Sequence, residues 1–202
     1  MANANIPRGL IPYRYTWGQK YNGAANIYSV PAAYGTALYI GDPLVATGAS
    51  DANGIPVVQI ATAAGGNYTI GAMVGIVNGG APGAPTIPVT RDLPIYHPAS
   101  TAQYILVADD PNLLFEIQED SVGGSIAMAT AGTKNADLIA GAGSTTTGFS
   151  GWQLDSSTIQ TTNTLQLRLV QGLTQTDNTM AATNAKWLVK INLHSMNNLT
   201  GI

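Results

Sequence analysis

The stretch Gln103-Tyr-Ile-Leu-Val-Ala-Asp-Asp-Pro-Asn-Leu-Leu-Phe-Glu-Ile-Gln118 decides the fold class of this 202-residue chain. An apolar run over 103–108 is followed by Asp109-Asp-Pro-Asn112 and by a second apolar run over 113–118. Asp and Asn side chains bind nearby backbone amides and a proline presets φ, so the four middle residues favour a turn. We therefore predict a β-hairpin made of strands 103–108 and 113–118.

Similar segments recur on both sides of this hairpin. Apolar runs of strand length, separated by turn residues, lie at 36–40, 55–61, 68–78, 164–170 and 186–194. Residues 121–131 favour one short helix, and the sequence contains no longer amphipathic helix. Many short strands at fairly even spacing are typical of a β-sandwich or β-barrel. The prediction is a single all-β domain of one of these two kinds over residues 36–202.

One of these runs shows which side chains should point into the core. Leu165, Leu167 and Leu169 alternate with Gln166 and Arg168. This period of two indicates a half-buried strand, with the leucines inward and the two polar residues outward.

The first part of the chain differs from the rest. Residues 1–35 contain three prolines, and Tyr13, Tyr15 and Trp17 alternate before Tyr21. In an extended backbone the three alternating aromatic side chains would share one face. They could form a first strand of the domain itself, or anchors of an extended arm that docks on a neighbouring subunit, since aromatic residues are preferred at interfaces. The prediction is an extended N-terminal arm over 1–35, with Tyr13, Tyr15, Trp17 and Tyr21 as interface anchors.

Charge is sparse in this chain. Charged residues make up 9% of it, and 8 basic and 11 acidic side chains give a formal net charge of −3. The basic residues are spread along the sequence without a cluster, so we expect no nucleic-acid partner. An isolated soluble domain normally carries more charge, which suggests that another chain covers part of the surface. We predict a homo-oligomer, either a dimer or a trimer.

The sequence also predicts a soluble protein. The longest apolar and glycine-rich run, Ile70–Val77, is far shorter than the ~20 residues of a membrane-spanning helix. The first residues lack the basic start and apolar run of a secretory signal. The chain has no cysteine, so disulfide scaffolds and cysteine-based metal sites or nucleophiles are excluded.

Residues with catalytic potential are few and isolated. His97 and His194 stand at no metal-ligand spacing from each other or from a carboxylate. Ser150 lies in Phe149-Ser-Gly151, which is not a nucleophile elbow. We expect no catalytic residue, no metal and no cofactor, and therefore a protein that is not an enzyme.

Carboxylates gather at one place in the sequence. They are Asp109, Asp110, Glu116, Glu119 and Asp120. The main interpretation is turn chemistry at the predicted hairpin, since the register of a calcium-binding loop is missing. A cation site near Asp109 and Asp110, or a catalytic carboxylate pair, remains the alternative.

Five segments in the second half of the chain form a recognisable pattern. They are Tyr104-Ile-Leu-Val-Ala-Asp-Asp-Pro111, Phe115-Glu-Ile-Gln118, Ser150-Gly-Trp-Gln-Leu-Asp-Ser-Ser157, Leu165-Gln-Leu-Arg-Leu-Val170 and Asn184-Ala-Lys-Trp-Leu-Val-Lys-Ile-Asn-Leu-His194. In this order they resemble segments of structural proteins of tailed-bacteriophage heads. The resemblance covers about residues 100–194, and the N-terminal 35 residues are not part of it. The resemblance is to the cement (decoration) type of head protein.

This resemblance implies a function that composition alone does not. A cement protein would bind the outside of the capsid and reinforce contacts between subunits of the major capsid protein, without catalytic residues. The protein would be made in the host cytoplasm and reside in the virion. Two alternatives remain open: another virion component, such as a tail, adaptor or fibre-base protein, and a carbohydrate-binding adhesive β module.

Overall fold

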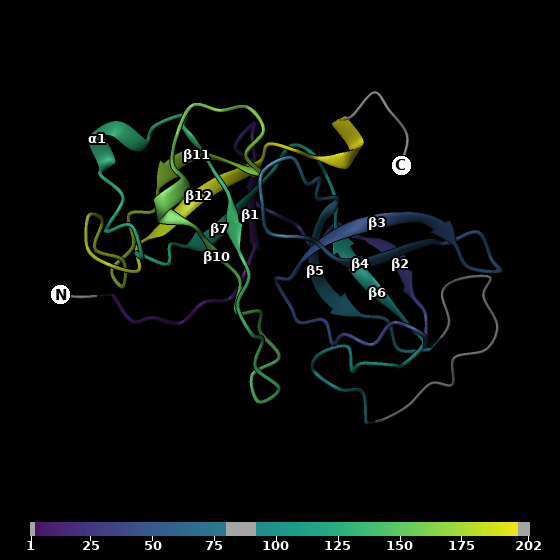
Figure 1. Ribbon diagram of the computed structural model, residues 1–202. Coiled ribbons are helices and arrows are strands. Elements are labelled where there is room, and N and C mark those ends of the chain that lie inside the picture. Colours follow the sequence, from purple (N-terminus) through teal and green to yellow (C-terminus); the bar gives the residue numbers. More distant parts are fainter. Residues whose placement is uncertain (1–2, 80–91, 198–202) are drawn as a thin grey trace.

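The computed structural model describes residues 3–79 and 92–197, and in them the chain is almost entirely β (Figure 1). Strands hold 38% of the residues and helices 5%, which confirms the all-β prediction. The helical turns are α1 (Met128–Ala131), η1 (Ser156–Thr158) and η2 (Ser195–Asn197). The helix predicted over 121–131 is therefore limited to its last turn.

One half of the molecule, the barrel lobe, is a closed five-stranded barrel in the order β2-β4-β3-β5-β6. Its strands are β2 (Asn26–Val30), β3 (Pro43–Ser50), β4 (Pro56–Ile60), β5 (Gly71–Ile76) and β6 (Gln103–Ala108). Its interior is filled by apolar side chains, among them Leu44, Val58, Met73, Ile105 and Val107. The barrel is thus a packed core rather than a channel.

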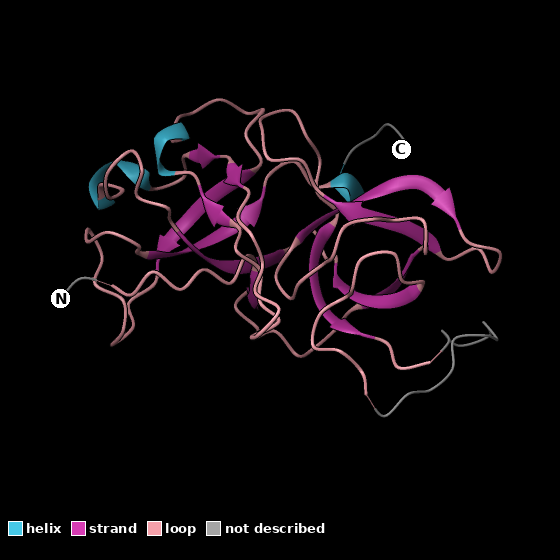
Figure 2. Ribbon diagram, turned by 60° about the horizontal axis from the view of Figure 1, so that its bottom comes forward, coloured by secondary structure: helices cyan, strands magenta, loops and turns pink. Residues whose placement is uncertain are grey.

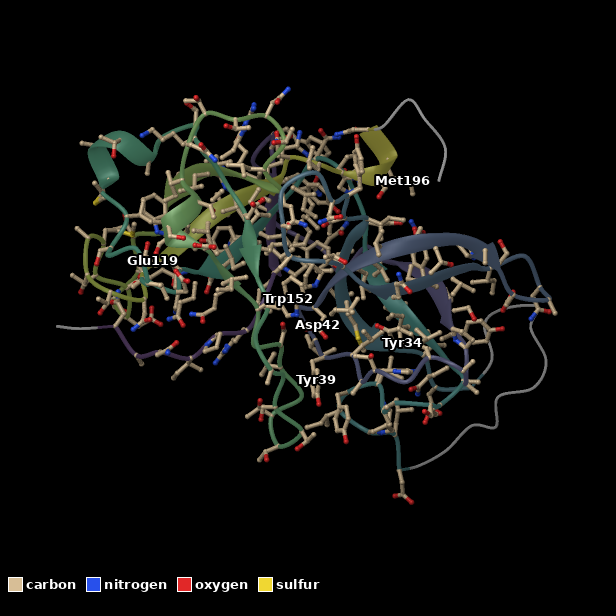
Figure 3. The ribbon with its side chains drawn as sticks, viewed as in Figure 1. Tyr34, Tyr39, Asp42, Glu119, Trp152 and Met196 are labelled. Carbon is tan, nitrogen blue, oxygen red and sulfur yellow. The ribbon has the colours of Figure 1, made fainter. Side chains whose placement is uncertain are left out.

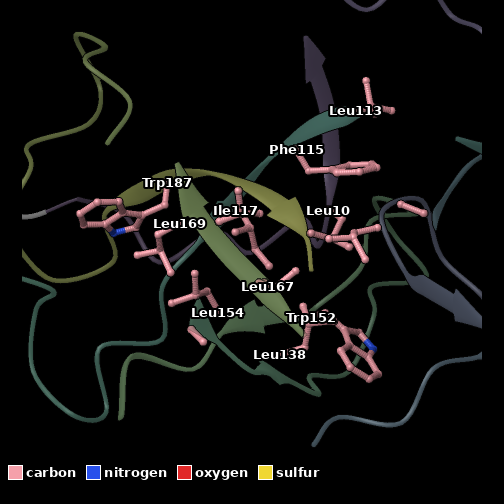
Figure 4. Packing of buried hydrophobic residues seen from close by; sticks show 14 of the residues in the cluster. Leu10, Leu113, Phe115, Ile117, Leu138, Trp152, Leu154, Leu167, Leu169 and Trp187 are labelled. Carbon is pink, nitrogen blue, oxygen red and sulfur yellow. The ribbon is translucent and has the colours of Figure 1, made fainter. Parts of the chain in front are cut away.

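The other half, the sheet lobe, is built on an antiparallel sheet in the order β1-β7-β12-β11-β8. Its strands are β1 (Ile11–Tyr15), β7 (Leu113–Gln118), β8 (Asn135–Ala136), β11 (Leu167–Gly172) and β12 (Lys186–Ile191). The short pair β9 (Leu138–Ile139) and β10 (Gln153–Leu154) supplies side chains to the same core as the inner face of this sheet. Figure 4 shows this core, in which Phe115, Ile117 and Leu167 are fully buried.

The chain path explains how the two lobes are joined. The sheet lobe begins with β1, the next five strands build the entire barrel, and the chain then returns to the sheet as β7. Figures 1 and 2 show the two groups of strands side by side. The barrel is therefore an insertion between two neighbouring strands of the sheet.

The predicted hairpin of 103–108 and 113–118 is wrong. Both strands exist, but β6 pairs with β2 and β5 in the barrel, whereas β7 pairs with β1 and β12 in the sheet. The turn chemistry itself is present, since Asp110 Oδ1 accepts the backbone N–H of Asn112 at 2.7 Å. Each strand pairs with a partner distant in sequence, which local turn signals do not reveal.

Asp109 holds the chain at the point where it leaves the barrel. Its carboxylate accepts hydrogen bonds from Asn26 Nδ2 at 2.9 Å and from the Tyr28 hydroxyl at 2.7 Å, and both of these residues belong to β2. These bonds secure the end of β6 against β2, so that the following residues turn toward the sheet.

The predicted N-terminal arm over 1–35 is not confirmed. Within it, β1 pairs with β7 and β2 belongs to the barrel, while Leu10 and Tyr15 are buried in the main core. The residues before β1 are also held, because Gln118 Nε2 donates to the Ala4 carbonyl at 2.8 Å. The boundary predicted between residues 35 and 36 therefore does not separate two parts of the fold.

Gln166 was predicted to point outward, and this prediction is wrong because its side chain is fully buried between the lobes. Its Oε1 accepts the backbone N–H groups of Ala64 (3.2 Å) and Leu138 (3.3 Å). Its Nε2 donates to the carbonyls of Thr62 (2.9 Å) and Asn67 (3.3 Å). A buried amide is stable only with such partners, and here they tie the β4–β5 segment to the sheet lobe.

A close backbone crossing forms the second tie between the lobes. The N–H of Leu10 donates to the Gly41 carbonyl at 2.8 Å, and the N–H of Gly41 donates to the Met73 carbonyl at 2.8 Å. Gly41 has φ +94°, and a Cβ at this position would overlap the Arg8 carbonyl oxygen. Only glycine satisfies both the backbone conformation and the crowding.

This crossing yields a first prediction. Gly41→Ala should lower the free energy of unfolding by about 2–5 kcal/mol, because it combines left-handed strain with steric overlap against backbone. Gly54→Ala is the matched control: it has φ +78° but open space around its Cβ, and should lose only about 1–2 kcal/mol. Urea unfolding of the three proteins measures both effects. Equal losses at both positions would show that the crossing is not crowded.

A second prediction concerns the N-terminal residues. A chain that begins at Ser29 lacks β1 and loses Leu10 and Tyr15 from the main core, so it should not unfold cooperatively. A chain that begins at Ile6 loses hydrogen bonds but no buried apolar side chain, and should remain folded. Near-UV circular dichroism and thermal melting distinguish the two outcomes. A folded chain beginning at Ser29 would restore the interpretation of this segment as an arm.

Candidate functional site

The outer face of the five-stranded sheet, turned away from the main core, is the candidate functional site. A groove of about 590 Å³ crosses it and is lined by Tyr13, Arg14, Gly18, Lys20, Gln171, Leu173, Thr174 and Leu188. Leu173 and Leu188 pack with Leu114 in a small apolar cluster of their own. Both leucines are buried, so the exposed lining of the groove is the Tyr13 ring beside two cations, and no carboxylate is among its described lining residues.

The strand register places basic side chains in a row across this face. Arg14 lies opposite Leu114 on β7, Leu114 lies opposite Lys190 on β12, and Lys190 lies opposite Arg168 on β11. Lys20 forms a backbone bridge with Arg14 at the edge of the sheet. We call Arg14, Lys20, Lys190 and Arg168 the basic row. The sequence showed no basic cluster, but folding gathers four of the eight basic residues in this row.

Two members of the basic row are held by uncharged partners. Arg14 Nη2 donates to Gln171 Oε1 at 3.2 Å, and Arg168 Nε donates to Asn135 Oδ1 at 3.1 Å. The ion pairs in the described part of the chain lie elsewhere on the same face. They join Lys186 Nζ to Asp177 at 2.6 Å and to Glu116 at 3.9 Å. Within residues 3–79 and 92–197, the basic row is thus left without a carboxylate partner.

The three alternating aromatic residues predicted to share one face do not do so. The register of β1 shifts between Pro12 and Arg14, so Tyr13 is the extra residue of a bulge. Tyr13 lines the outer groove, whereas Tyr15 is buried in the core and Trp17 stacks on it with ring centroids 4.8 Å apart. Tyr21 packs against the main core. Of the predicted anchors, Tyr13 and Trp17 remain exposed.

The carboxylates that were close in sequence are not brought together. Asp109 binds β2, Asp110 caps its own turn, and Glu116 pairs with Lys186 on the outer face. Among residues 3–79 and 92–197, no three His, Asp or Glu side chains are placed to hold a metal ion. Glu116 therefore does not join Asp109 and Asp110 as a third ligand of the cation site that was considered as an alternative.

Glu119 is a buried structural carboxylate in the sheet lobe. Its Oε2 accepts the Trp187 indole N–H at 2.9 Å and the backbone N–H of Ile126 at 3.3 Å. Its Oε1 accepts the Ser121 hydroxyl at 3.1 Å. Burial raises the pKa of the Glu119 carboxyl, and these hydrogen bonds oppose the rise. Both oxygens are occupied by the protein itself, so the group anchors the 119–126 segment to β12.

The two histidines lie apart and are both buried. His97 Nε2 is 2.8 Å from the Thr101 carbonyl oxygen, and burial lowers the pKa of His97. His194 Nδ1 accepts the backbone N–H of Met196 at 3.1 Å, and burial lowers the pKa of His194 to about 4. Both imidazoles are therefore neutral near pH 7 and serve the packing of nearby loops.

Asp42 is a carboxylate buried at the junction of the lobes, beside Trp152 (Figure 3). Its Oδ2 accepts the backbone N–H of Tyr39 at 2.8 Å, and the Ser150 hydroxyl also donates to this carboxylate. Burial raises the pKa of the Asp42 carboxyl from 3.8 to about 6, and the hydrogen bonds offset only part of this rise. A cavity of about 380 Å³ lies here, and Tyr39, Asp42 and Trp152 are among its lining residues. The Tyr39 ring stacks on the Tyr96 ring and lies against Gly143.

Comparisons with known proteins add no relative. No protein-family model, curated protein or solved structure matches this chain. No helix within residues 3–79 and 92–197 is long and apolar enough to cross a membrane. The chemistry of the outer face and the sequence resemblance therefore carry the functional argument.

The basic row was missed at the sequence level for a physical reason. The sequence predicts that Arg168 points outward and that Lys190 lies in a strand, so each residue alone is compatible with a surface position. Their shared row depends on which strands pair and in which register, and no local pattern encodes this. Arg14 lies in the segment predicted to be an arm, and its pairing with Leu114 of β7 joins residues 100 positions apart.

A third prediction follows from Asp42. Its pKa is higher in the folded state than its ordinary value, so stability is lost as pH rises from about 4 to 6. A rise of about two pKa units corresponds to about 3 kcal/mol. The unfolding free energy of Asp42→Asn minus that of the original chain should therefore increase by about 2–3 kcal/mol when the pH is raised from 4 to 7.5.

Asp51 provides the control for this measurement. The Tyr104 hydroxyl lowers the pKa of Asp51, so Asp51→Asn should show a pH dependence of the opposite sign. Urea unfolding at the two pH values measures both variants. If the difference in unfolding free energy between Asp42→Asn and the original chain is the same at pH 4 and pH 7.5, the Asp42 charge does not destabilise the junction.

Proposed function

We propose that this protein is a virion structural protein of the cement type. It binds the outside of a tailed-bacteriophage capsid and stabilises contacts between subunits of the major capsid protein. The observation that carries the proposal is the outer face of the sheet, where a groove with the exposed Tyr13 ring and the basic row lie open on a chain of net charge −3. An exposed face of this composition suits a protein partner better than solvent.

The sequence resemblance supports the same part of the molecule. Its segments at 115–118, 165–170 and 184–194 contain most of the residues of β7, β11 and β12, and the segment at 150–157 contains β10. These are the central strands of the sheet and part of its inner cover. The portion of the chain that resembles phage head proteins therefore builds the face proposed to bind the capsid.

The proposal includes binding in many copies. Repeated capsid sites would give avidity to a protein whose individual contact is weak. A homo-oligomer, dimer or trimer, would add to this effect. Such an oligomer is not expected to form by strand pairing at the edge of β1, because residues 19–21 already cover this edge. The Tyr15 N–H donates to the Gln19 carbonyl at 2.8 Å, and the Tyr21 N–H donates to the Tyr13 carbonyl at 3.1 Å.

Microscopy of particles gives the fourth prediction. Particles are purified from a culture that makes the chain, and an antibody against the purified protein is applied with gold label. Gold should decorate the head surface at many positions, and particles made without the chain should stay unlabelled and lose their DNA at lower temperature. Label on the tail would instead identify a tail, adaptor or fibre-base protein. Absence of label, together with saturable binding on a glycan array, would favour the adhesive carbohydrate-binding alternative.

A further inference from the structure

We infer that the basic row and the adjoining groove bind an extended, acidic segment of a partner protein. This inference rests on the proposed function only for the partner's identity as a capsid protein. The chemistry of the occupant follows from the outer face itself. The basic row contributes four positive charges, and the adjoining groove contributes the exposed ring of Tyr13.

The strongest observation is a pair of like charges. Lys190 and Arg168 are directly opposite each other on the antiparallel strands β12 and β11. Like charges at directly opposite positions destabilise a sheet. Arg14 extends the same row on the other side of Leu114. Local arrangements that oppose folding are expected at functional sites, and within residues 3–79 and 92–197 no carboxylate pairs with this row to relieve it.

The charge of the whole chain makes this concentration more pronounced. The formal net charge is −3, and the basic row accounts for +4, so the rest of the chain carries −3 − 4 = −7. Four positive charges thus share one face of a protein whose remaining residues are acidic on balance. Such a face attracts an acidic segment locally, while the rest of the surface repels a bulky polyanion.

The shape of the site selects an extended segment. Arg14 and Arg168 stand on strands separated by three strand spacings, which corresponds to roughly 14 Å. An extended peptide of five residues covers about this length, and alternate side chains share one face. Its acidic side chains would meet the basic row, and an apolar side chain would lie in the groove beside the exposed Tyr13 ring.

A protein partner fits these observations better than a nucleic acid. Nucleic-acid sites combine many cations with aromatic platforms on which bases stack. Here a single aromatic ring, Tyr13, is among the described residues that line the groove, beside two cations. The nucleic-acid alternative is therefore an outcome of the test and not a second proposal.

The test uses the full chain and a peptide of seven residues, Leu-Ser-Glu-Ser-Glu-Ser-Glu, labelled with a fluorophore. In an extended conformation its leucine and its three glutamates lie on one face. Fluorescence anisotropy at low salt should show saturable binding that is at least tenfold tighter than for the same peptide with Gln at each Glu position. Binding should weaken steeply with added salt. A labelled twelve-residue oligothymidine is measured in parallel.

Lys190→Glu is the decisive variant because it should change binding and stability in opposite directions. It replaces the like-charge pair with an Arg168–carboxylate pair, so the melting temperature at low salt should rise by about 1–4 °C. Peptide binding should fall at least tenfold. Arg8→Glu makes the same charge change outside the basic row, where Arg8 lies over the Phe149 ring, and should bind the peptide as the original chain does.

Several results would overturn the inference. They are equal binding of the Glu and Gln peptides, unchanged peptide binding by Lys190→Glu, a lower melting temperature for this variant, or tighter binding of the oligothymidine than of the peptide. The outcome is independent of the particle experiment. Loss of gold label from heads would reject the capsid as the partner, while the peptide measurements would still decide whether this face takes an acidic segment.

Discussion

The pairing of β1 with β7 is the constraint on which the rest of this structure depends. Tyr15 and Leu113 are cross-strand partners, although the entire barrel lies between them in the sequence. Bringing such distant residues together costs loop-closure entropy, which the buried side chains of Leu10, Tyr15 and Phe115 must offset. Once this pair forms, the two ends of the barrel are held next to each other, and β7 is placed to receive β12 on its other side.

The junction between the lobes is held by uncharged groups more than by ion pairs. Gln166 satisfies four backbone groups, and Gly41 allows two backbones to cross at hydrogen-bonding distance. This fits a chain in which 9% of the residues are charged. Asp42 is the exception, because its burial raises its pKa to about 6 and makes the junction less stable when the carboxylate ionises. The two lobes are therefore held together by hydrogen bonds and a close backbone contact, which require a glycine at position 41 and an amide side chain at position 166.

The same rigidity gives the outer face its character. The inner side of the sheet is committed to the core, so its outward residues are displayed in fixed rows with the spacing of the strands. In one row Lys190 and Arg168 face each other, although this lowers the stability of the sheet. Arrangements that oppose folding are retained where binding repays them. The proposed attachment to a capsid and the proposed acidic partner segment both use this face.

The sequence by itself determined the features that depend on neighbours along the chain. Period-2 alternation and turn residues indicated an all-β protein, the strands near 103–108 and 113–118, and the turn chemistry of Asp110. Local sterics and hydrogen bonding decide these features, so a short window of residues contains the information.

Only the tertiary structure decided which strands pair and which side chains share a face. A strand presents the same backbone groups to any partner, and its choice depends on the burial of distant residues such as Leu10 and Phe115. For this reason the predicted hairpin became a connection between lobes, and the predicted arm became two strands. A bulge at Tyr13 likewise moved Tyr15 into the core. The basic row exists because the register of four strands aligns residues that are far apart in the sequence, and register is a property of the folded chain.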